Sequence, residues 1–300
     1  MISGHTKLFC IVADPVTHVK TPQLFNTHLE QRGIDAVLVP LHVTADQLGN
    51  VVRGLQKVSN LSAIVVTVPH KISILEYCDD FDSSARIAGA ANILRRDADG
   101  RLTGANFDGI GFVRSLESAM GPVDGKTAYL AGAGGVARAI AFSLAQAGIR
   151  NLSDYNRTPA KAEELLSAVA NRFPLVKTSV ANDTPDGYDI AINGTSVGLK
   201  SNGGLPFSIE RLPSTAVVAE VVMEPITTEL LIAAKKRGLR VVPGDGMLRH
   251  QLQSWIEFAH CGNPSAALEH PSKHLFAATS APRMVLTSTV IADTLITSEN

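Results

Sequence analysis

The 300-residue sequence predicts an α/β protein of two parts, an N-terminal α/β domain and a doubly wound parallel sheet. Short apolar runs alternate with amphipathic stretches along most of the chain, which is typical of sheets covered by helices. A glycine-rich turn at 132–137 lies between a predicted strand and a predicted helix. Apolar residues make up 45% of the chain and charged residues 18%, so the sequence can bury more than one core.

The first part, residues 1–108, is predicted to form a sheet with helices between its strands. Thr21-Pro22 starts the first helix, because proline is favoured in a first turn, and Gly33 ends it. Asp99-Gly100 lies between two short predicted strands and predicts a hairpin turn. The expected elements are strand 8–13, helix 21–33, strand 36–41, helix 44–57, strand 62–68, helix 72–88 and a hairpin over 92–103.

The second part, residues 109–246, shows regular alternation of strand and helix. The expected elements are helix 109–120, strand 127–131, helix 136–147, strand 152–155, helix 159–172, strands 189–192 and 216–222, helix 229–237 and strand 240–243. A final helix within 247–270 has no new sheet to complete, so we expect it to pack back across the cleft between the two parts. The tail, 271–300, has no clear period and is expected to be at most partly ordered.

Charge and cysteine usage exclude several classes of protein. The 27 Lys and Arg nearly balance the 28 Asp and Glu, which argues against nucleic acid or an anionic membrane as a partner and favours a small-molecule substrate. Three scattered cysteines without a C-x-x-C pair predict neither disulfides nor a zinc site, and favour the cytoplasm. No run approaches the roughly 18 apolar residues of a membrane span. We expect a monomer or a homodimer.

The strongest local motif has the form G-x-G-x-x-A and follows strand 127–131. Its first glycine permits a tight turn, its second lets the backbone approach a pyrophosphate, and its small third position lets the helix pack on the sheet. This motif predicts a Rossmann-type dinucleotide-binding domain. The expected cofactor-binding residues are Gly132, Ala133, Gly134, Gly135, Val136 and Ala137.

The end of the next strand favours NADP over NAD. Sites for NAD usually place an acidic residue there, on the ribose hydroxyls. Here the strand ends with Asn156, Arg157 and Thr158, and Lys161 follows one turn later. Arginine and lysine suit a 2′-phosphate. The alternative is a solvated basic turn, with Asp154 as the acidic ribose ligand.

The segment Gly194-Thr-Ser-Val-Gly198 matches the G-x-S-x-G nucleophile elbow of serine hydrolases. An elbow requires a helix directly after the serine, and the following Gly- and Pro-containing segment predicts none. We therefore expect this loop to pack near the cofactor, with Thr195 among its ligands.

The nine histidines do not predict a metal site. His250, His260 and His270 are spaced by ten residues, which rotates them off a common helix face, and no H-E-x-x-H occurs.

Together these segments resemble the shikimate dehydrogenase family. The resemblance runs in order from about residue 8 to residue 262. The matching motifs are Asp14-Pro-Val-Thr-His-Val-Lys-Thr-Pro22, Thr67-Val-Pro-His-Lys71, Gly89-Ala-Ala-Asn92, Asn106-Phe-Asp-Gly109, the segment 132–137, Asn156-Arg-Thr158, Asn193-Gly-Thr-Ser-Val-Gly198 and Gly246-Met-Leu-Arg-His-Gln251.

The resemblance implies a two-domain enzyme that reversibly oxidises shikimate to 3-dehydroshikimate with NADP. Residues 1–108, completed by the helix in 247–270, would bind substrate, and 109–246 would bind NADP. Lys71 and Asp108 match the catalytic pair, of which either could transfer the proton. The implied substrate ligands are Thr21, Thr67, Asn92 and Gln251.

Three positions depart from the family pattern. Val19 stands where the family usually has Ser, Val65 where it has Asn, and Phe107 where it has Thr. Each exchange removes a hydrogen-bonding group near the expected substrate, Val19 from the carboxylate site itself. We therefore expect weakened shikimate affinity. The alternatives are a dehydrogenase of quinate or another cyclic hydroxy acid, or a non-catalytic NADP-binding protein.

Overall fold

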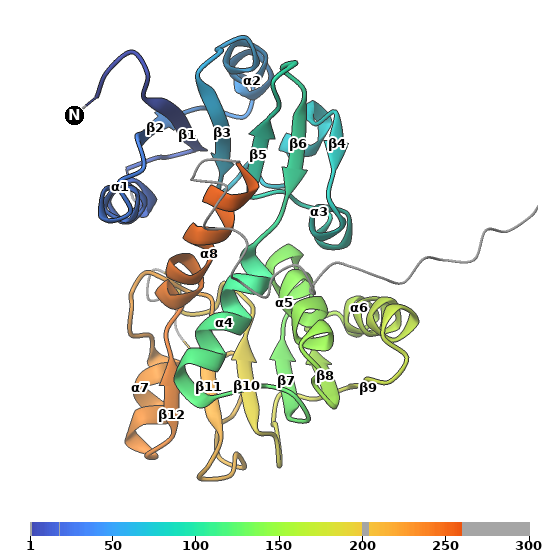
Figure 1. Cartoon of the computed structure of the whole chain (residues 1–300). Coiled ribbons are helices and arrows are strands. Elements are labelled where there is room, and N and C mark those ends of the chain that lie inside the picture. Colours follow the sequence, from blue (N-terminus) through green and yellow to red (C-terminus); the bar gives the residue numbers. More distant parts are fainter. Residues whose placement is uncertain (1, 18, 200–203, 260–300) are drawn as a thin grey trace, which may run out of the picture. The chain divides into compact units, whose positions relative to one another are not determined.

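The computed structural model describes residues 2–17, 19–199 and 204–259 and contains two sheets (Figure 1). Both sheets are six-stranded and are covered by helices, which confirms the predicted α/β class. They lie within one compact unit, residues 1–262. A domain boundary at residue 108 therefore stays a prediction, and the expected tail 271–300 lies outside the described residues.

The first sheet has the strand order β2-β1-β3-β5-β6-β4. Strands β1, β2 and β3 are parallel, whereas β5 and β6 form the predicted antiparallel hairpin. The six strands are β1 (Lys7–Ala13), β2 (Ala36–His42), β3 (Leu61–Val66), β4 (Asp80–Phe81), β5 (Ile93–Arg96) and β6 (Leu102–Ala105). Successive residues of β3 face opposite cores, Ala63 and Val65 on one side and Ile64 and Val66 on the other.

The helices of the first part are α1 (Thr21–Gln31), α2 (Leu48–Gln56), the short 3₁₀ helix η1 (Ser73–Tyr77) and α3 (Ser83–Ala88). The prediction of one helix over 72–88 was wrong. Asp82 caps α3 by accepting a hydrogen bond from the Ala85 N–H at 3.0 Å, and the preceding Asp80–Phe81 pairs with β6 instead. The helix expected at 44–57 begins only at Leu48 because a turn occupies Thr44 to Gln47.

The second sheet is entirely parallel, with the order β12-β11-β10-β7-β8-β9. From β7 the chain builds the sheet first on one side, through β8 and β9, and then on the other, through β10, β11 and β12, which is the doubly wound order. Ligands of such sheets bind beyond the carboxyl ends of the strands at the point of reversal, here between β7 and β10. The strands are β7 (Thr127–Ala131), β8 (Asn151–Tyr155), β9 (Lys177–Val180), β10 (Ile190–Asn193), β11 (Val217–Glu220) and β12 (Arg240–Val242).

Strand β9 was not predicted. It lies at the edge of the sheet and most of its residues are exposed, so its sequence lacks the apolar pattern that marks the inner strands. Its existence follows from pairing with β8, a tertiary contact.

The remaining helices are α4 (Asp108–Met120), α5 (Gly135–Gln146), α6 (Pro159–Arg172) and α7 (Glu229–Lys236), followed by the final helix α8 (Asp245–Phe258). Helix α8 packs along α4 and also contacts α1, as expected of a helix with no sheet to complete (Figure 1). Glycine allows these helices to approach closely: a Cβ on Gly109 would lie 2.2 Å from the Ala139 carbonyl oxygen, and one on Gly111 would lie 2.5 Å from that of Met247. Among the residues that the structure describes, no helix combines the length and apolar character needed to cross a bilayer.

Candidate active site

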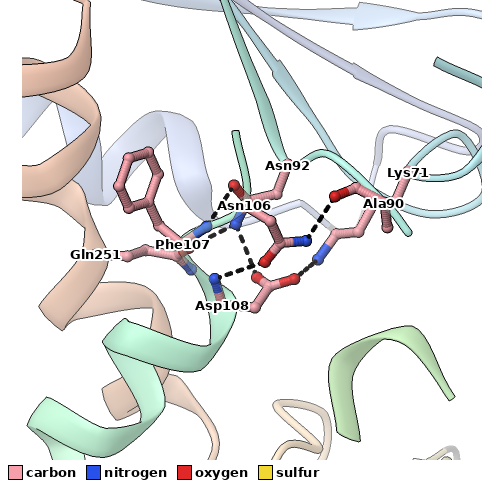
Figure 2. A network of polar contacts seen from close by, with 7 residues as sticks. All are labelled: Lys71, Ala90, Asn92, Asn106, Phe107, Asp108 and Gln251. Carbon is pink, nitrogen blue, oxygen red and sulfur yellow. Dashed lines mark hydrogen bonds and ion pairs between the residues drawn. The ribbon is translucent and has the colours of Figure 1, made fainter. Parts of the chain in front are cut away.

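Four of the residues that the sequence singled out meet in one polar network (Figure 2). Lys71 follows β3, Asn92 directly precedes β5, Asp108 is the first residue of α4, and Gln251 lies in the middle of α8. The network thus joins the carboxyl end of one strand to the amino end of another and to two helices. Its members come from segments as far apart as 159 residues, the separation between Asn92 and Gln251.

Asp108 is the centre of the network. One carboxylate oxygen, Oδ2, accepts from the Lys71 Nζ at 2.7 Å, and the other, Oδ1, accepts from the Asn92 Nδ2 at 2.9 Å. Its side chain is 2% exposed, whereas that of Lys71 is 20% exposed. The position at the start of α4 also favours a negative charge, because unpaired N–H groups and the helix dipole point toward it. The pair therefore combines a buried carboxylate with a partly exposed lysine side chain.

The Asn92 amide is fully engaged within the network. Its Nδ2 donates to Asp108 and also to the Gln251 Oε1, the latter at 2.8 Å, while its Oδ1 accepts from the Phe107 N–H at 3.0 Å. These partners fix which side of the amide is oxygen, because an N–H must face an acceptor. Since the Gln251 oxygen is occupied, the Gln251 Nε2 is left as the donor that this side chain can offer to a substrate.

Asn106 supports the network from behind, a role that the sequence analysis did not assign. Its Oδ1 accepts from the Asp108 N–H at 3.0 Å and its Nδ2 donates to the Ala90 carbonyl at 3.2 Å. Asparagine two residues before a helix start commonly makes this turn, and that spacing was the available signal. The backbone of Lys71 is fixed as well, since its carbonyl accepts from the Ala91 N–H at 2.8 Å.

Thr21, Thr67 and Val19 lie outside the four-residue network. Thr21 is the buried first residue of α1, and Thr67 directly follows β3. Val19 packs against an apolar cluster that includes Val65 and Phe107. The three residues that depart from the family pattern, Val19, Val65 and Phe107, thus belong to, or pack against, one apolar core.

The glycine turn has the geometry expected of a dinucleotide site. Gly132 has a φ of 112°, and its N–H donates to the Tyr155 carbonyl at 2.7 Å. Gly134 is the N-cap of α5, so the unpaired N–H groups of Gly135 and Val136 begin a twelve-residue helix. Ala137 is fully buried against the sheet and Ala133 is partly buried, consistent with close helix packing.

Arg157, Thr158 and Lys161 are exposed beside this turn. The Asn156 Nδ2 donates to the Thr158 carbonyl at 2.9 Å and fixes the turn that precedes α6. Within the described part of the chain, neither Arg157 nor Lys161 has an ion-pair partner. Both cations are therefore available to a phosphate group.

Asp154 does not suit the alternative role of ribose ligand. Its side chain is 0% exposed within β8, and neither carboxyl oxygen has a hydrogen-bond partner among the described residues. Burial raises the pKa of Asp154 to about 7. A carboxyl buried in this way cannot reach a cofactor at the edge of the sheet.

The Gly194–Gly198 segment is a turn and not a nucleophile elbow. The Leu199 N–H donates to the Ser196 carbonyl at 3.1 Å, and Gly198, with a φ of 95°, prevents a right-handed helix from starting directly after Ser196. The segment instead packs against the glycine turn, because a Cβ on Gly132 would lie 3.0 Å from the Thr195 Cγ2. Thr195 is thus placed beside the expected cofactor site.

No cluster of three metal-ligating side chains occurs among the residues that the structure describes. His250 lies on α8, where burial and then the charge of Arg114 lower its pKa. His260 and His270 lie outside the described residues. The predicted absence of a metal stays a prediction.

Comparisons with known proteins agree with the motifs. The sequence profile of the shikimate dehydrogenase substrate binding domain matches residues 11–94. The NADP(+) shikimate dehydrogenase of Lysinibacillus sphaericus is 40% identical over 256 residues, covering 85% of this chain and 91% of that protein.

Solved structures give the same result. A crystal structure of a shikimate dehydrogenase in complex with NADP⁺ matches with a TM-score of 0.78 and 34% identity, over 86% of this chain and 91% of that one. The 5-ketofructose reductase of Gluconobacter sp. strain CHM43 matches with a TM-score of 0.77 and 31% identity, over 85% and 93%. The same fold therefore occurs in enzymes with differently named substrates.

Proposed function

This chain belongs to the shikimate dehydrogenase family, and from that premise we propose that it catalyses the reversible oxidation of shikimate to 3-dehydroshikimate with NADP. The observation that supports this most strongly is the Lys71–Asp108 pair, 2.7 Å apart, with a buried Asp108 side chain and a partly exposed Lys71 side chain. Oxidation of a secondary alcohol needs a group that takes the hydroxyl proton, and this pair offers one.

The chemistry divides between the two sheets. In the direction of shikimate oxidation, the C–H bond at the hydroxyl-bearing carbon breaks. The hydride, which carries both bonding electrons, is transferred to the oxidised cofactor NADP⁺, the electron acceptor. The hydroxyl proton passes either to the Nζ of Lys71 as a neutral amine or to the Asp108 carboxylate, and the C–O bond becomes a carbonyl. Asn92 keeps the Asp108 carboxylate oriented toward Lys71, so the pair keeps one geometry throughout the reaction.

The substrate is held, in this proposal, by donors around the pair. Gln251 offers its Nε2 to a ring oxygen, because Asn92 occupies its Oε1. Asn92 contributes mainly by positioning, since its Nδ2 hydrogens and its Oδ1 are engaged by protein groups. Thr21 and Thr67 supply hydroxyls for the carboxylate and the ring, and Val19 provides an apolar wall.

The cofactor is held by the second sheet. The N–H groups at the start of α5 bind the pyrophosphate of NADP, while Arg157 and Lys161 bind its 2′-phosphate and Thr158 adds a hydroxyl. Thr195 borders the nicotinamide half, and Asn156 fixes the basic turn. Residues 1–108 with α8 would then form the substrate domain and 109–246 the NADP domain. We propose a cytoplasmic enzyme, as a monomer or homodimer.

The test is the absorbance of reduced nicotinamide after the protein is mixed with NADP and shikimate, then separately with quinate and with NAD. We expect reduction with NADP and shikimate that is abolished in Lys71→Ala. Reduction with quinate alone would assign the activity to another cyclic hydroxy acid. NADP binding without reduction by either substrate would contradict the proposal and favour a non-catalytic NADP-binding protein.

A further inference from the structure

A buried carboxyl group lies behind the expected cofactor site, at the end of β11. Glu220 is 0% exposed and pairs in register with Asn193 of the neighbouring β10. Its side chain points to the face of the sheet covered by α7, as shown by its hydrogen bond to Thr228. The proposed reaction uses neither Glu220 nor Thr228, although burying a carboxyl group is costly.

Thr228 connects Glu220 to the far end of the loop formed by residues 193–198, here called the 193–198 loop. The Thr228 hydroxyl donates to the Glu220 Oε2 at 2.6 Å and accepts from the Leu231 N–H at 3.4 Å, which caps α7. Gly198, with a φ of 95°, lies against Thr228, because a Cβ there would be 3.3 Å from the Thr228 Cγ2. A displacement of Thr228 would therefore also move Gly198.

Asn193 determines the near end of the same loop. Its Oδ1 accepts from the Thr195 N–H at 3.0 Å and from the Thr195 hydroxyl at 2.7 Å, and its Nδ2 donates to the Val197 carbonyl at 3.0 Å. The Gly194 N–H also donates to the Ala131 carbonyl at 2.8 Å. The loop is thus fixed where it meets the glycine turn of the cofactor site.

We propose that Glu220 is a positioning residue which, through Thr228 and Asn193, keeps the 193–198 loop against the glycine turn and thereby sets the affinity for NADP. The inference rests on the proposed function, because it takes Thr195 to border the cofactor. Glu220 itself lies behind the sheet and contacts neither substrate nor cofactor in this proposal.

The character of the carboxyl group supports this role. Burial raises the pKa of Glu220 to about 7, while the hydrogen bond from Thr228 to Oε2 lowers it; the other carboxyl oxygen, Oε1, has no hydrogen-bond partner among the described residues. Oε2 of Glu220 thus holds Thr228 at the far end of the loop, and strand register places the same residue beside Asn193 at the near end. Since a neutral acceptor of the same shape makes the same bonds, glutamine should replace glutamate and leucine should not.

The experiment measures the Kd for NADP by calorimetry, together with kcat and the melting temperature, in full-length variants. We expect Glu220→Leu to raise the Kd about tenfold, as loss of one buried hydrogen bond implies, with kcat at saturating NADP changed less than threefold. Glu220→Gln should stay within about twofold of wild type. Thr228→Val should resemble Glu220→Leu, and the double variant should add little to either.

The matched control is Thr127→Val, at the opposite end of the same sheet. Its hydroxyl donates to the Asp189 Oδ2 at 2.9 Å, so the substitution also removes a hydrogen bond and should lower the melting temperature. Its Kd for NADP should not change, because Thr127 is remote from the glycine turn.

A Glu220→Leu variant with a lowered melting temperature and an unchanged Kd would overturn the inference, as would equal Kd losses in the Thr127→Val control. If Glu220→Leu does not fold, an unchanged Kd in Thr228→Val would overturn it instead. Wild-type protein that binds NADP but does not oxidise shikimate contradicts only the proposed function, since the inference is tested by NADP affinity.

Discussion

Two buried aspartates in this protein have opposite surroundings. Asp108, 2% exposed, has a partner for each carboxylate oxygen, the Lys71 ammonium and the Asn92 amide. Asp154, 0% exposed in β8, has no hydrogen-bond partner among the described residues, and burial raises its pKa to about 7. Burial alone therefore does not identify a catalytic acid. What distinguishes Asp108 is a hydrogen-bond partner for each carboxylate oxygen, which together fix the orientation of the side chain.

The largest effect should come from removing the charge of Asp108. Asp108→Asn leaves an acceptor for Asn92 but faces the Lys71 ammonium with an amide, so the proton can no longer be shared between them. We expect kcat to fall about 10²–10⁴-fold, the usual contribution of a general acid–base group. Steady-state kinetics with NADPH formation checks this. A loss below threefold would show that the carboxylate is dispensable.

The next effect concerns the apolar positions Val19 and Val65. Each lacks one hydrogen bond of about 0.5–1.5 kcal/mol that the family pattern supplies, so the shikimate KM should exceed that of typical members about 5- to 150-fold. This weakened affinity stays a prediction. The combined substitution Val19→Ser and Val65→Asn should lower the KM and change kcat less.

Quinate provides a second test of the apolar position Val19, because this substrate has an additional hydroxyl beside its carboxylate. Burying that group against Val19 without a partner costs about 1–3 kcal/mol, so quinate should be the poorer substrate. A low wild-type KM for shikimate, or a preference for quinate, would contradict this interpretation. A double variant without effect would indicate a less polar hydroxy acid as substrate.

For the second sheet, Arg157→Ala should raise the Kd for NADP about 10- to 100-fold and leave that for NAD nearly unchanged. The reason is the loss of a charge-assisted hydrogen bond of about 1.5–3 kcal/mol to the 2′-phosphate. Arg172→Ala, in the last turn of α6, is the control and should alter neither value. Equal losses for both cofactors would exclude the 2′-phosphate role.

The smallest effect concerns stability and tests Asp154 itself. Its folded-state pKa of about 7 exceeds the ordinary value of 3.8, so the folded protein keeps a proton that the unfolded chain releases. The free energy of unfolding should therefore fall as the pH rises from about 4 to about 7. The raised pKa of Glu220, about 7, should also lower the free energy of unfolding as the pH rises over this range.

Asp154→Leu should flatten this dependence and raise the free energy of unfolding at pH 8 by about 1–3 kcal/mol. Urea unfolding at pH 5 and pH 8 measures both. The exposed Asp186→Asn serves as the control and should leave the slope unchanged. An unchanged slope in Asp154→Leu would mean that Asp154 is already charged at pH 5.

Local signals predicted the second sheet better than the first. Strand Thr127–Ala131 and helix Pro159–Arg172 were predicted with the observed bounds, because an apolar run before glycine and a proline at a helix start are strong local signals. Strand β4 is only two residues long and exists through its pairing with β6, and β9 is an exposed edge. Neither has a periodic pattern that the sequence could show.

The residues of the candidate site could be predicted from the family resemblance and not from their spacing along the sequence. Lys71 alone reads as an ordinary surface lysine, and only the resemblance linked it to Asp108, 37 residues away, which the structure places at 2.7 Å. The supporting contacts in both parts of the molecule depend on tertiary structure: Gln251 reaches Asn92 from α8, and Glu220 meets Asn193 through strand register. No local pattern encodes such contacts.

The most direct test of the division between a catalytic first sheet and a cofactor-binding second sheet is a single turnover of Lys71→Ala. The variant is saturated with NADP, mixed with shikimate, and followed by nicotinamide absorbance, with the Kd for NADP measured on the same sample and the exposed Lys57→Ala as control. We predict a rate reduced at least about 100-fold with a Kd within about twofold of wild type. A rate above half of wild type, or a parallel loss of NADP affinity, would contradict it.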